Sequence, residues 1–146
     1  MFYLTRRETF NAAHKLSRPD WSDEKNRATF GKCANKNWHG HNYELFVTVA
    51  GDPHPDTGFV MDAKRLSDIV NDLIIEDVDH SNFNLDVPWM PEGKQPTTEI
   101  IAGAIWDRLE QPLQEGGARL FRVRVQETEN IWSDYYGPQG HPADVV

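Results

Sequence analysis

The sequence predicts an α+β domain in which an antiparallel sheet carries two helices on one face. Its 146 residues, 38% of them hydrophobic, are enough for one domain with its own core. Two segments with a two-residue hydrophobic period come first, two segments with a helical period follow, and two strand-like segments come last. Strands and helices in such blocks are typical of α+β proteins. We assign residues 1–137 to this domain and residues 138–146 to a C-terminal tail with little to pack.

The first two strands are predicted at residues 2–14 and 39–51. Every second residue falls on one face, which holds Phe10, Ala12 and His14 in the first strand and His39, His41, Tyr43, Leu45, Val47 and Val49 in the second. Residues 17–36 between the strands are polar and rich in turn formers, and we predict a long loop there. A loop of that length in a compact domain is usually functional.

Two amphipathic helices are predicted in the middle of the chain. Asp62 is the expected N-cap of the first helix, and Thr97 or Thr98 is that of the second. The apolar stripes are Leu66, Ile69, Val70, Leu73 and Ile74 in the first helix, and Ile100, Ile101, Ala104, Ile105 and Leu109 in the second, which ends at Gly116 and Gly117. Residues 77–96 between the helices are expected to be irregular.

A third strand is predicted at residues 120–127, with Phe121, Val123 and Val125 on its inward face. Glu127 continues that face, so the pattern predicts an inward carboxylate that needs partners. Two parallel N–H donors of a ligand are one such partner. The alternative is that the strand ends earlier and Glu127 is solvated. A fourth strand is expected at residues 130–136.

The net charge of the chain is −8 with neutral histidines. This acidity argues against a nucleic-acid partner and against an anionic membrane surface, because both need basic patches. The apolar runs are too short to span a membrane, and no apolar segment follows Arg6 and Arg7 as it would in a twin-arginine signal. A single cysteine forms no internal disulfide. We therefore predict a cytoplasmic protein.

His14, His39 and His41 are candidate metal ligands. His39 and His41 are two apart on a strand, so their side chains point the same way, and His14 ends the other strand. If the two strands are neighbours, three imidazoles converge; such a set suits Zn²⁺ and leaves one coordination position open. The alternative is that they are partly buried histidines bonded to backbone carbonyl groups.

Cys33 and the pair Asp79–His80 are further candidates. A thiolate near a cationic metal site can act as a base or nucleophile, whereas most single cysteines are inert and buried. Asp79 can orient His80 and stabilise its charged form; alternatively, both belong to an acidic, solvated helix end. Glu99 lies in the first turn of the second helix, where the helix dipole alone explains a carboxylate.

Five short motifs, taken in order, resemble the 6-pyruvoyl-tetrahydropterin synthase family, which includes the 6-carboxy-tetrahydropterin synthases of the queuosine pathway. They are "FNAAH" with His14, "CANKNWHGHNYEL" with Cys33, His39 and His41, "VDHSNFNLD" with Asp79 and His80, "PTTE" with Thr98 and Glu99, and "VQETEN" with Glu127. Each motif is weak alone, but five in the right order are specific, and they cover nearly the whole chain.

The resemblance implies the tunnelling fold, a four-stranded antiparallel sheet with two helices on one face. It implies trimers whose sheets close a β-barrel, and two trimers stacked into a homohexamer with active sites between subunits. The implied activity is a zinc-dependent lyase that converts 7,8-dihydroneopterin triphosphate to 6-pyruvoyl-tetrahydropterin and releases triphosphate. The implied roles are zinc binding by His14, His39 and His41, proton transfer by Cys33, Asp79 and His80, and binding of the pterin by Glu127, Glu99 and Thr98.

Alternatives to this activity are open from the sequence. The five residues between Cys33 and His39 resemble the spacing of the 6-pyruvoyl branch, but 6-carboxy-tetrahydropterin is formed from the same substrate. A non-catalytic member that binds a pterin is disfavoured by the presence of Cys33, Asp79 and His80 together. A module with a purely structural metal is disfavoured by the open coordination position.

A triphosphate needs local positive charge in this acidic chain. Basic residues gather around the first long loop: Lys15, Arg18, Lys25, Arg27, Lys32 and Lys36. We expect some of them to line a phosphate entry, with Lys25 and Arg27 as the first to neutralise, and a solvated loop is the alternative. Trp38 and the loop 87–96 are expected to border the pocket and to influence substrate choice.

Overall fold

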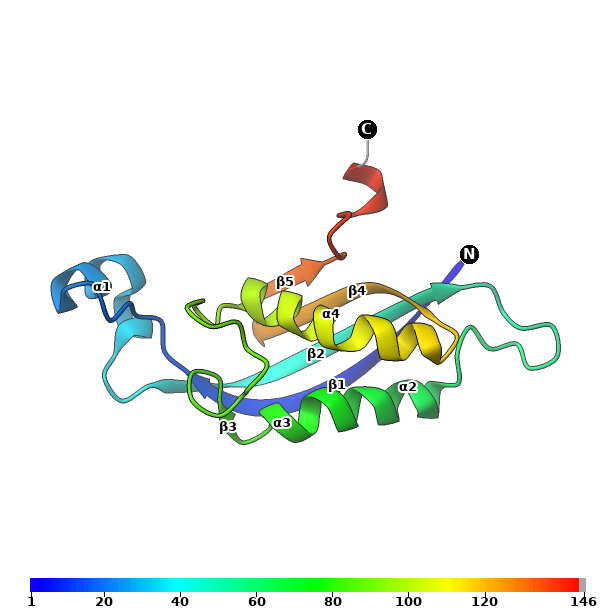
Figure 1. Ribbon diagram of the computed structural model, residues 1–146, viewed down its shortest axis with the longest axis horizontal. Coiled ribbons are helices and arrows are strands. Elements are labelled where there is room, and N and C mark those ends of the chain that lie inside the picture. The colour runs from blue at the N-terminus through cyan, green and yellow to red at the C-terminus, as the bar shows by residue number, and fades with distance from the viewer. Residues whose placement is uncertain (145–146) are drawn as a thin grey trace.

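A curved sheet forms one layer of the molecule, and helices cover one of its faces (Figure 1). The computed structural model describes residues 1–144. Neighbouring strands are antiparallel in the order β1 (Phe2–His14), β2 (His39–Gly51), β4 (Arg119–Thr128) and β5 (Ile131–Tyr135). β3 (Ser81–Asn82) pairs in parallel with the outer edge of β1. The sheet is therefore five-stranded and mixed, not four-stranded and antiparallel as the sequence predicts. The sequence does not reveal β3, because a strand of two residues has no hydrophobic period.

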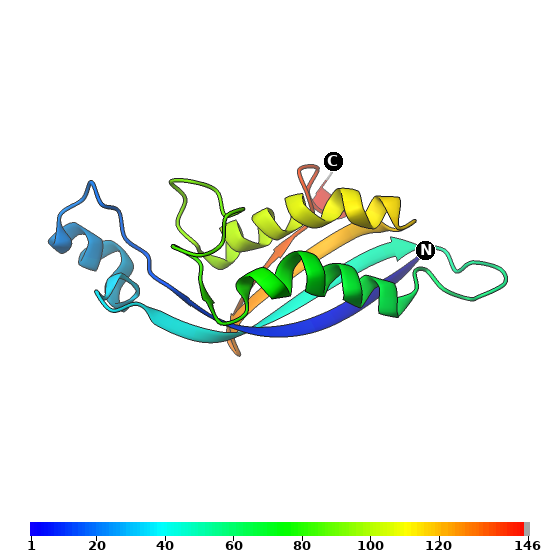
Figure 2. The same cartoon turned by 60° about the horizontal axis from the view of Figure 1, so that its bottom comes forward.

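The covering layer consists of α2 (Ala63–Val70), which continues through a wide turn at Asn71–Ile75 into α3 (Glu76–Val78), and of α4 (Thr98–Glu115) (Figure 2). The expected caps are present: Asp62 accepts a hydrogen bond from the backbone of Lys64, and Thr97 from that of Ile100. The expected apolar stripes face the sheet, and their fully buried members are Leu66, Val70, Ile74, Ile101, Ile105 and Leu109. Burial of these stripes fixes both helices on one face of the sheet.

Residues 17–36 are not the structureless loop that their composition predicts. They contain α1 (Asp23–Phe30) and a 3₁₀ turn at Gly31–Ala34. Ser22 caps α1 by accepting a hydrogen bond from the Lys25 backbone, and the only buried residue of α1 is Asn26. A helix that is polar on almost all sides carries no apolar stripe, so sequence periodicity does not reveal it. This segment projects from the end of the sheet at which β1 stops and β2 starts (Figure 1).

The prediction that Phe121 lies on the inward face of β4 is wrong. A register shift between β2 and β4 at Thr48 and Val49 changes the alternation, so that Leu120 is buried and Phe121 is only half-buried. The Phe121 ring instead packs at 4.4 Å from that of Tyr3. Val123 and Val125 are fully buried, as the pattern predicts.

The predicted tail has more to pack than its composition suggests. The His141 ring lies 4.5 Å from that of Tyr136, and a 3₁₀ turn follows at Pro142–Asp144. Residues 145–146 of the predicted tail lie outside the described residues. Among residues 1–144, no helix has the length and apolar character needed to cross a membrane.

Candidate active site

The end of β1 and the start of β2 bring three histidines together. In the register of the two strands, His14 lies directly opposite His39, and His41 lies opposite Ala12. All three side chains are on the face of the sheet that the helices cover, so the convergence that the sequence predicts is confirmed. The ring centroids are 4.5 Å apart for His14 and His39, 5.1 Å for His14 and His41, and 5.0 Å for His39 and His41.

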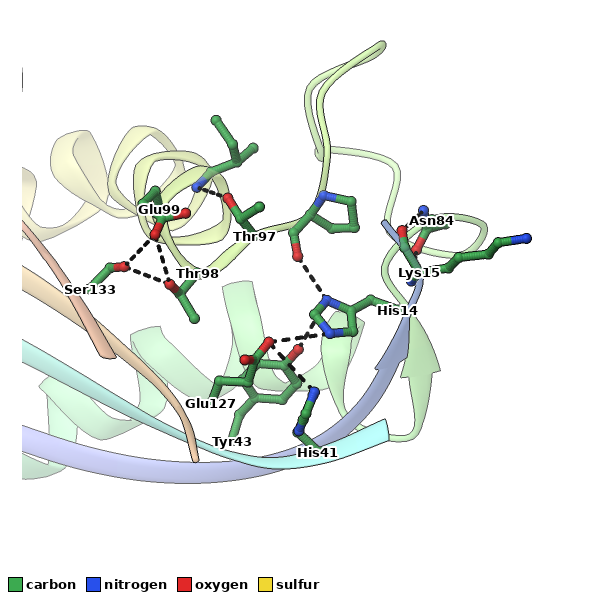
Figure 3. A network of polar contacts seen from close by, with 12 residues as sticks. His14, Lys15, His41, Tyr43, Asn84, Thr97, Thr98, Glu99, Glu127 and Ser133 are labelled. Atoms are coloured by element: carbon green, nitrogen blue, oxygen red, sulfur yellow. Dashed lines mark hydrogen bonds and ion pairs between the residues drawn. The ribbon is translucent and has the colours of Figure 1, made fainter. Parts of the chain in front are cut away.

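His14 is held in one orientation by a contact from outside the sheet. Its Nδ1 lies 2.8 Å from the backbone carbonyl oxygen of Pro96, in the segment that precedes α4, and 3.4 Å from the Tyr43 hydroxyl (Figure 3). A carbonyl oxygen only accepts hydrogen bonds, so the proton of the neutral ring is on Nδ1. The lone pair of Nε2 then points into the cluster, as in a histidine that binds a metal.

The cluster has the donor set of a metal site. His14 Nε2, His39 Nδ1 and His41 Nε2 are buried and have no hydrogen-bond partner among the described residues. A buried ring nitrogen without a partner is costly, at about 1–3 kcal/mol. The three residues offer ligand atoms within 4.8 Å of one another. These unpartnered nitrogens therefore fit a metal ion that imidazole prefers, such as zinc.

Glu127 adds a carboxylate to this cluster from β4. Its Oε1 lies 3.2 Å from His14 Nε2 and 3.6 Å from His41 Nε2 (Figure 3). Its contact with the His14 imidazole is the main cause that holds the pKa of Glu127 below its ordinary value, and burial opposes this effect. With the His14 proton on Nδ1, the Glu127 contact brings a carboxylate against a nitrogen lone pair, and a shared cation would relieve it. The prediction that Glu127 points inward is confirmed.

Burial keeps the other ligands neutral. It is the main cause that lowers the pKa of His39 and of His41; the His14 imidazole lowers both further, and Glu127 opposes the shift in both. Burial also raises the pKa of the Tyr43 phenol, with smaller contributions from the charges of Glu127 and Cys33. Neutral imidazole is the form that binds a metal.

Cys33 lies in the 3₁₀ turn after α1 and is half-buried. Its backbone carbonyl accepts a hydrogen bond of 2.8 Å from the Leu16 backbone. This bond ties the cysteine to the chain two residues beyond His14. A position of the Cys33 thiol close to the histidines stays a prediction from the sequence.

Asp79 and His80 form a pair on the outer edge of β1. His80 Nδ1 lies 3.1 Å from Asp79 Oδ2, and the two side chains are 82% and 39% exposed. Asp79 accepts a hydrogen bond of 2.9 Å from the Asn11 backbone, which is the main cause that lowers its pKa. Asn11 and Leu16, whose N–H bonds the Cys33 carbonyl, are five positions apart, roughly 16 Å if the chain is extended. The pair and the cysteine are thus anchored at different points of the chain.

Thr98 and Glu99 form a separate polar group with Ser133 of β5. The Thr98 hydroxyl lies 2.6 Å from that of Ser133, and Glu99 Oε1 lies 3.4 Å from it (Figure 3). Ser133 pairs with Val125, two residues before Glu127 on the neighbouring strand. Hydrogen bonds, chiefly from Thr97, lower the pKa of Glu99. Two of the three predicted pterin-binding residues thus lie at the start of α4 in contact with β5, whereas Glu127 on the neighbouring strand is in contact with the histidines.

A cationic pocket of about 660 Å³ lies between the chain that follows β1 and the segment of α1. Four of the six predicted basic residues line it, namely Lys15, Arg18, Arg27 and Lys36, while Lys25 and Lys32 do not. One carboxylate, that of Asp23, faces the same space. Lys25 instead lies 4.0 Å from the centre of the Trp21 ring. This pocket has the charge and size to accept an anionic group.

Comparison with known proteins identifies the family of this chain. The family model described as 6-pyruvoyl tetrahydropterin synthase matches residues 3–138. The chain belongs to the 6-pyruvoyl tetrahydropterin synthase family. It is 42% identical over 134 residues to the human protein named 6-pyruvoyl tetrahydrobiopterin synthase, covering 92% of this chain and 90% of the human one. It is 30% identical over 118 residues to the 6-carboxy-5,6,7,8-tetrahydropterin synthase of Bacillus subtilis (strain 168), covering 78% of this chain and 77% of that protein.

A solved structure gives the same result for the fold. The 6-pyruvoyl tetrahydropterin synthase of Caenorhabditis elegans matches with a TM-score of 0.85 and 33% identity, over 93% of this chain and 95% of that one. The α+β class and the tunnelling fold predicted from the sequence are confirmed for this member of the synthase family.

Several residues of the site were not predicted from the sequence. Pro96, whose carbonyl orients His14, lies in a stretch without periodicity, and a backbone carbonyl leaves no trace in residue type. The sequence analysis also does not predict Ser133, although the two-residue period of the fourth strand places it on the same face as Tyr135. Tyr43 was placed on the histidine face, but its role as a neighbour of His14 was not predicted.

Proposed function

We propose that this protein converts 7,8-dihydroneopterin triphosphate to 6-pyruvoyl-tetrahydropterin with release of triphosphate, using Zn²⁺. The observation that carries this proposal is the set of three unpartnered imidazole nitrogens next to Glu127. Its support from the comparisons is the family and the name of the human relative.

His14, His39 and His41 would hold the zinc ion. When bound there, zinc supplies Lewis acidity to the hydroxyl groups of the substrate side chain. The protein contributes the neutral state of its ligands through burial, and it fixes His14 through the Pro96 carbonyl. A site with three protein ligands leaves a position open for substrate.

Cys33 is the proposed base that removes a proton from carbon in the substrate side chain. Its thiolate form is the active one, and the neighbouring metal would favour that form. The bond between its carbonyl group and Leu16 ties the cysteine to the strand of His14. Such positioning sets the distance between base and proton.

Asp79 and His80 are the proposed relay and proton donor. Because both are exposed and roughly 16 Å of chain separates their anchor from that of Cys33, we propose that they act on the cysteine of a neighbouring subunit. This requires the homohexamer of two stacked trimers, with each active site between subunits. The outer edge of β1 is then a subunit contact.

Glu127 is the proposed anchor of the amino-pyrimidine edge of the pterin, helped by Glu99 and Thr98. Once a metal ion occupies the imidazole nitrogens, the Glu127 carboxylate is free to accept two N–H donors in parallel. Its lowered pKa keeps it in the ionised form that this requires.

The cationic pocket is the proposed site for the triphosphate. Lys15, which lines the pocket, directly follows His14 in the chain. Of the basic residues named above, this favours Lys15, Arg27 and Lys36, since Arg18 is already bonded to Asp20.

The test is to incubate the zinc-loaded protein with 7,8-dihydroneopterin triphosphate, beside Cys33→Ala, and to follow triphosphate and pterin by chromatography and mass. A 6-pyruvoyl product that the variant does not form supports the proposal. A 6-carboxy product with acetaldehyde would assign the protein to the other branch with the same site. Pterin binding without turnover would indicate a non-catalytic member.

A further inference from the structure

The outer edge of β1 continues to be paired after the strand itself ends. In an extended chain, successive backbone groups alternate between the two edges, so every second residue faces the same neighbour. Within β1, this outer edge binds the backbone of the following segment: the Asn11 carbonyl accepts from His80, and the Ala13 carbonyl accepts from Phe83. Both partners flank β3.

Beyond β1, two side-chain amides take over this pairing. The Asn84 amide accepts from the Lys15 backbone N–H and donates to the Lys15 carbonyl, at 2.9 Å for both bonds (Figure 3). The Gln95 amide does the same with Ser17, again at 2.9 Å for both bonds. Each amide therefore satisfies the N–H and the C=O of one residue, as a neighbouring strand would.

The Gln95–Ser17 contact links the chain segments that hold the two groups on which the proposed chemistry depends, His14 and Cys33. Gln95 directly precedes Pro96, whose carbonyl holds His14 Nδ1 at 2.8 Å. Ser17 directly follows Leu16, whose N–H holds the Cys33 carbonyl at 2.8 Å on the opposite edge. A shift of the Gln95 segment would therefore move a metal ligand, and a shift of Ser17 would move the thiol.

We propose that Gln95, assisted by Asn84, is a positioning residue for the metal centre: its amide acts as a substitute β-strand that keeps the Pro96 carbonyl on His14 and holds the chain to which the Cys33 backbone is bonded. This inference rests on the proposed function, because it assigns His14 to a metal. Gln95 itself touches neither the metal ligand atoms nor the thiol.

A second anchor of the same loop separates positioning from simple loop stability. The Trp89 indole N–H donates to Asp77 at 2.8 Å, which fixes the middle of the loop to α3. This contact holds the loop but does not border His14 or Ser17. Trp89→Phe therefore loosens the loop without touching the amide pairing, and it serves as the matched control for a purely structural effect.

The experiment compares Gln95→Glu, which loses the donor to the Ser17 carbonyl, and Gln95→Met, which loses both bonds without adding charge. Asn84→Asp tests the assisting amide, and Gln114→Glu, at an exposed position of α4, controls for added charge. Zn²⁺ affinity is measured by competition with a chromophoric chelator. The Nδ1–H resonance of His14 is measured by ¹⁵N NMR in the metal-free protein, and thermal unfolding is recorded in parallel.

We expect both Gln95 variants to lower Zn²⁺ affinity about 10- to 100-fold, the usual cost of losing an outer contact of a metal ligand. The His14 Nδ1–H signal should exchange faster with water, and kcat at saturating Zn²⁺ should fall more than KM rises. Asn84→Asp should show a smaller change, and Gln114→Glu and Trp89→Phe should leave the Zn²⁺ affinity unchanged.

Unchanged Zn²⁺ affinity and an unchanged His14 signal in folded Gln95 variants would overturn the inference, whatever their melting temperature. Equal losses in Trp89→Phe would also overturn it, since they would reduce Gln95 to a general loop anchor. Failure of the proposed function has a different signature: the wild-type protein itself would not bind Zn²⁺. The His14 signal would then still decide whether Gln95 positions that ring.

Discussion

The histidine centre and the Asp79–His80 pair both depend on β1, but they differ in how complete they are within one chain. The histidines lie on the helix-covered face, where His14 is 1% exposed and three ring nitrogens meet. Asp79 and His80 lie at the opposite edge of the strand, with the His80 side chain 82% exposed. β1 thus supports a histidine centre that is complete within one chain on its helix-covered face, and an Asp79–His80 pair that needs a further group at its outer edge.

The difference indicates which functions a single chain can perform. A buried cluster whose ligands come from two paired strands needs no other subunit to form. An exposed pair tied only to its own backbone needs a partner that brings a reacting group to it. We therefore expect metal binding to be a property of the single chain, and proton transfer to be a property of the assembly.

The largest effect should come from the histidine centre. His41→Ala removes one of three ligands, so Zn²⁺ affinity should fall by more than about 1,000-fold and turnover should be lost with it. The chelator competition assay measures this. His54→Ala, at an exposed histidine in the loop after β2, is the control and should bind Zn²⁺ as the wild type does. Retention of tight binding in His41→Ala would remove this residue from the ligand set.

The next largest effect should come from the Asp79–His80 pair. His80→Ala should lower kcat about 10²- to 10⁴-fold, the usual contribution of a general acid or base, and leave Zn²⁺ affinity unchanged. The decisive measurement mixes subunits: His80→Ala and Cys33→Ser, each inactive alone, are unfolded together and refolded. Recovery of activity in the mixture means that the pair and the thiol come from different subunits. No recovery, with mixed oligomers present, would place them in one subunit.

A moderate effect is expected at the cationic pocket that Lys15, Arg27 and Lys36 line. Arg27→Gln should raise KM about tenfold with little change in kcat, because a charge-assisted hydrogen bond to substrate is lost in ground state and transition state alike. Lys25→Gln is the matched control, since Lys25 is in the same helix but does not line the pocket. Equal KM changes in both variants would point to the general charge of α1 instead of the pocket.

The smallest effect should come from a polar contact of β1 that belongs to neither site. Burial raises the pKa of Glu8, but hydrogen bonds from Arg6, Ser67 and Asn71 outweigh it and bring the pKa below its ordinary value of 4.5. The ionised form is therefore favoured in the folded state, so its contribution is present above pH 4.5 and is lost as the pH falls through the lowered value.

Glu8→Gln should accordingly lower the free energy of unfolding by about 0.5 kcal/mol at pH 7, because solvent screens the pair on the side of Arg6, whose side chain is 45% exposed, although that of Glu8 is only 15% exposed. The difference from wild type should shrink towards zero below pH 4, and urea unfolding at the two pH values checks this. A difference that grows on acidification would contradict the direction of the pKa shift. Zn²⁺ binding at pH 7 should not change, which makes Glu8 a baseline for the two sites.

Much of this molecule follows from local patterns in its sequence. The strands at 2–14 and 39–51 were predicted with the bounds that the structure has, because alternation of apolar residues reports directly which face is buried. The same two-residue period places His39 and His41 on one face, and the position of His14 on its own strand adds the third candidate ligand. The inward direction of Glu127 follows from the alternation of β4 in the same way.

Other features exist only because distant segments meet. The polar helix α1 and the two-residue strand β3 have no apolar stripe or alternation, and the bulge that displaces Phe121 arises from pairing with β2. The Pro96 carbonyl on His14 and the Gln95 amide on Ser17 join residues 82 and 78 positions apart. Hydrogen bonds between an irregular segment and a strand edge depend on where the chain returns after folding, and residue type alone does not specify that. The sequence by itself determined which three histidines can converge as candidate metal ligands, and the tertiary structure decided what holds them in place.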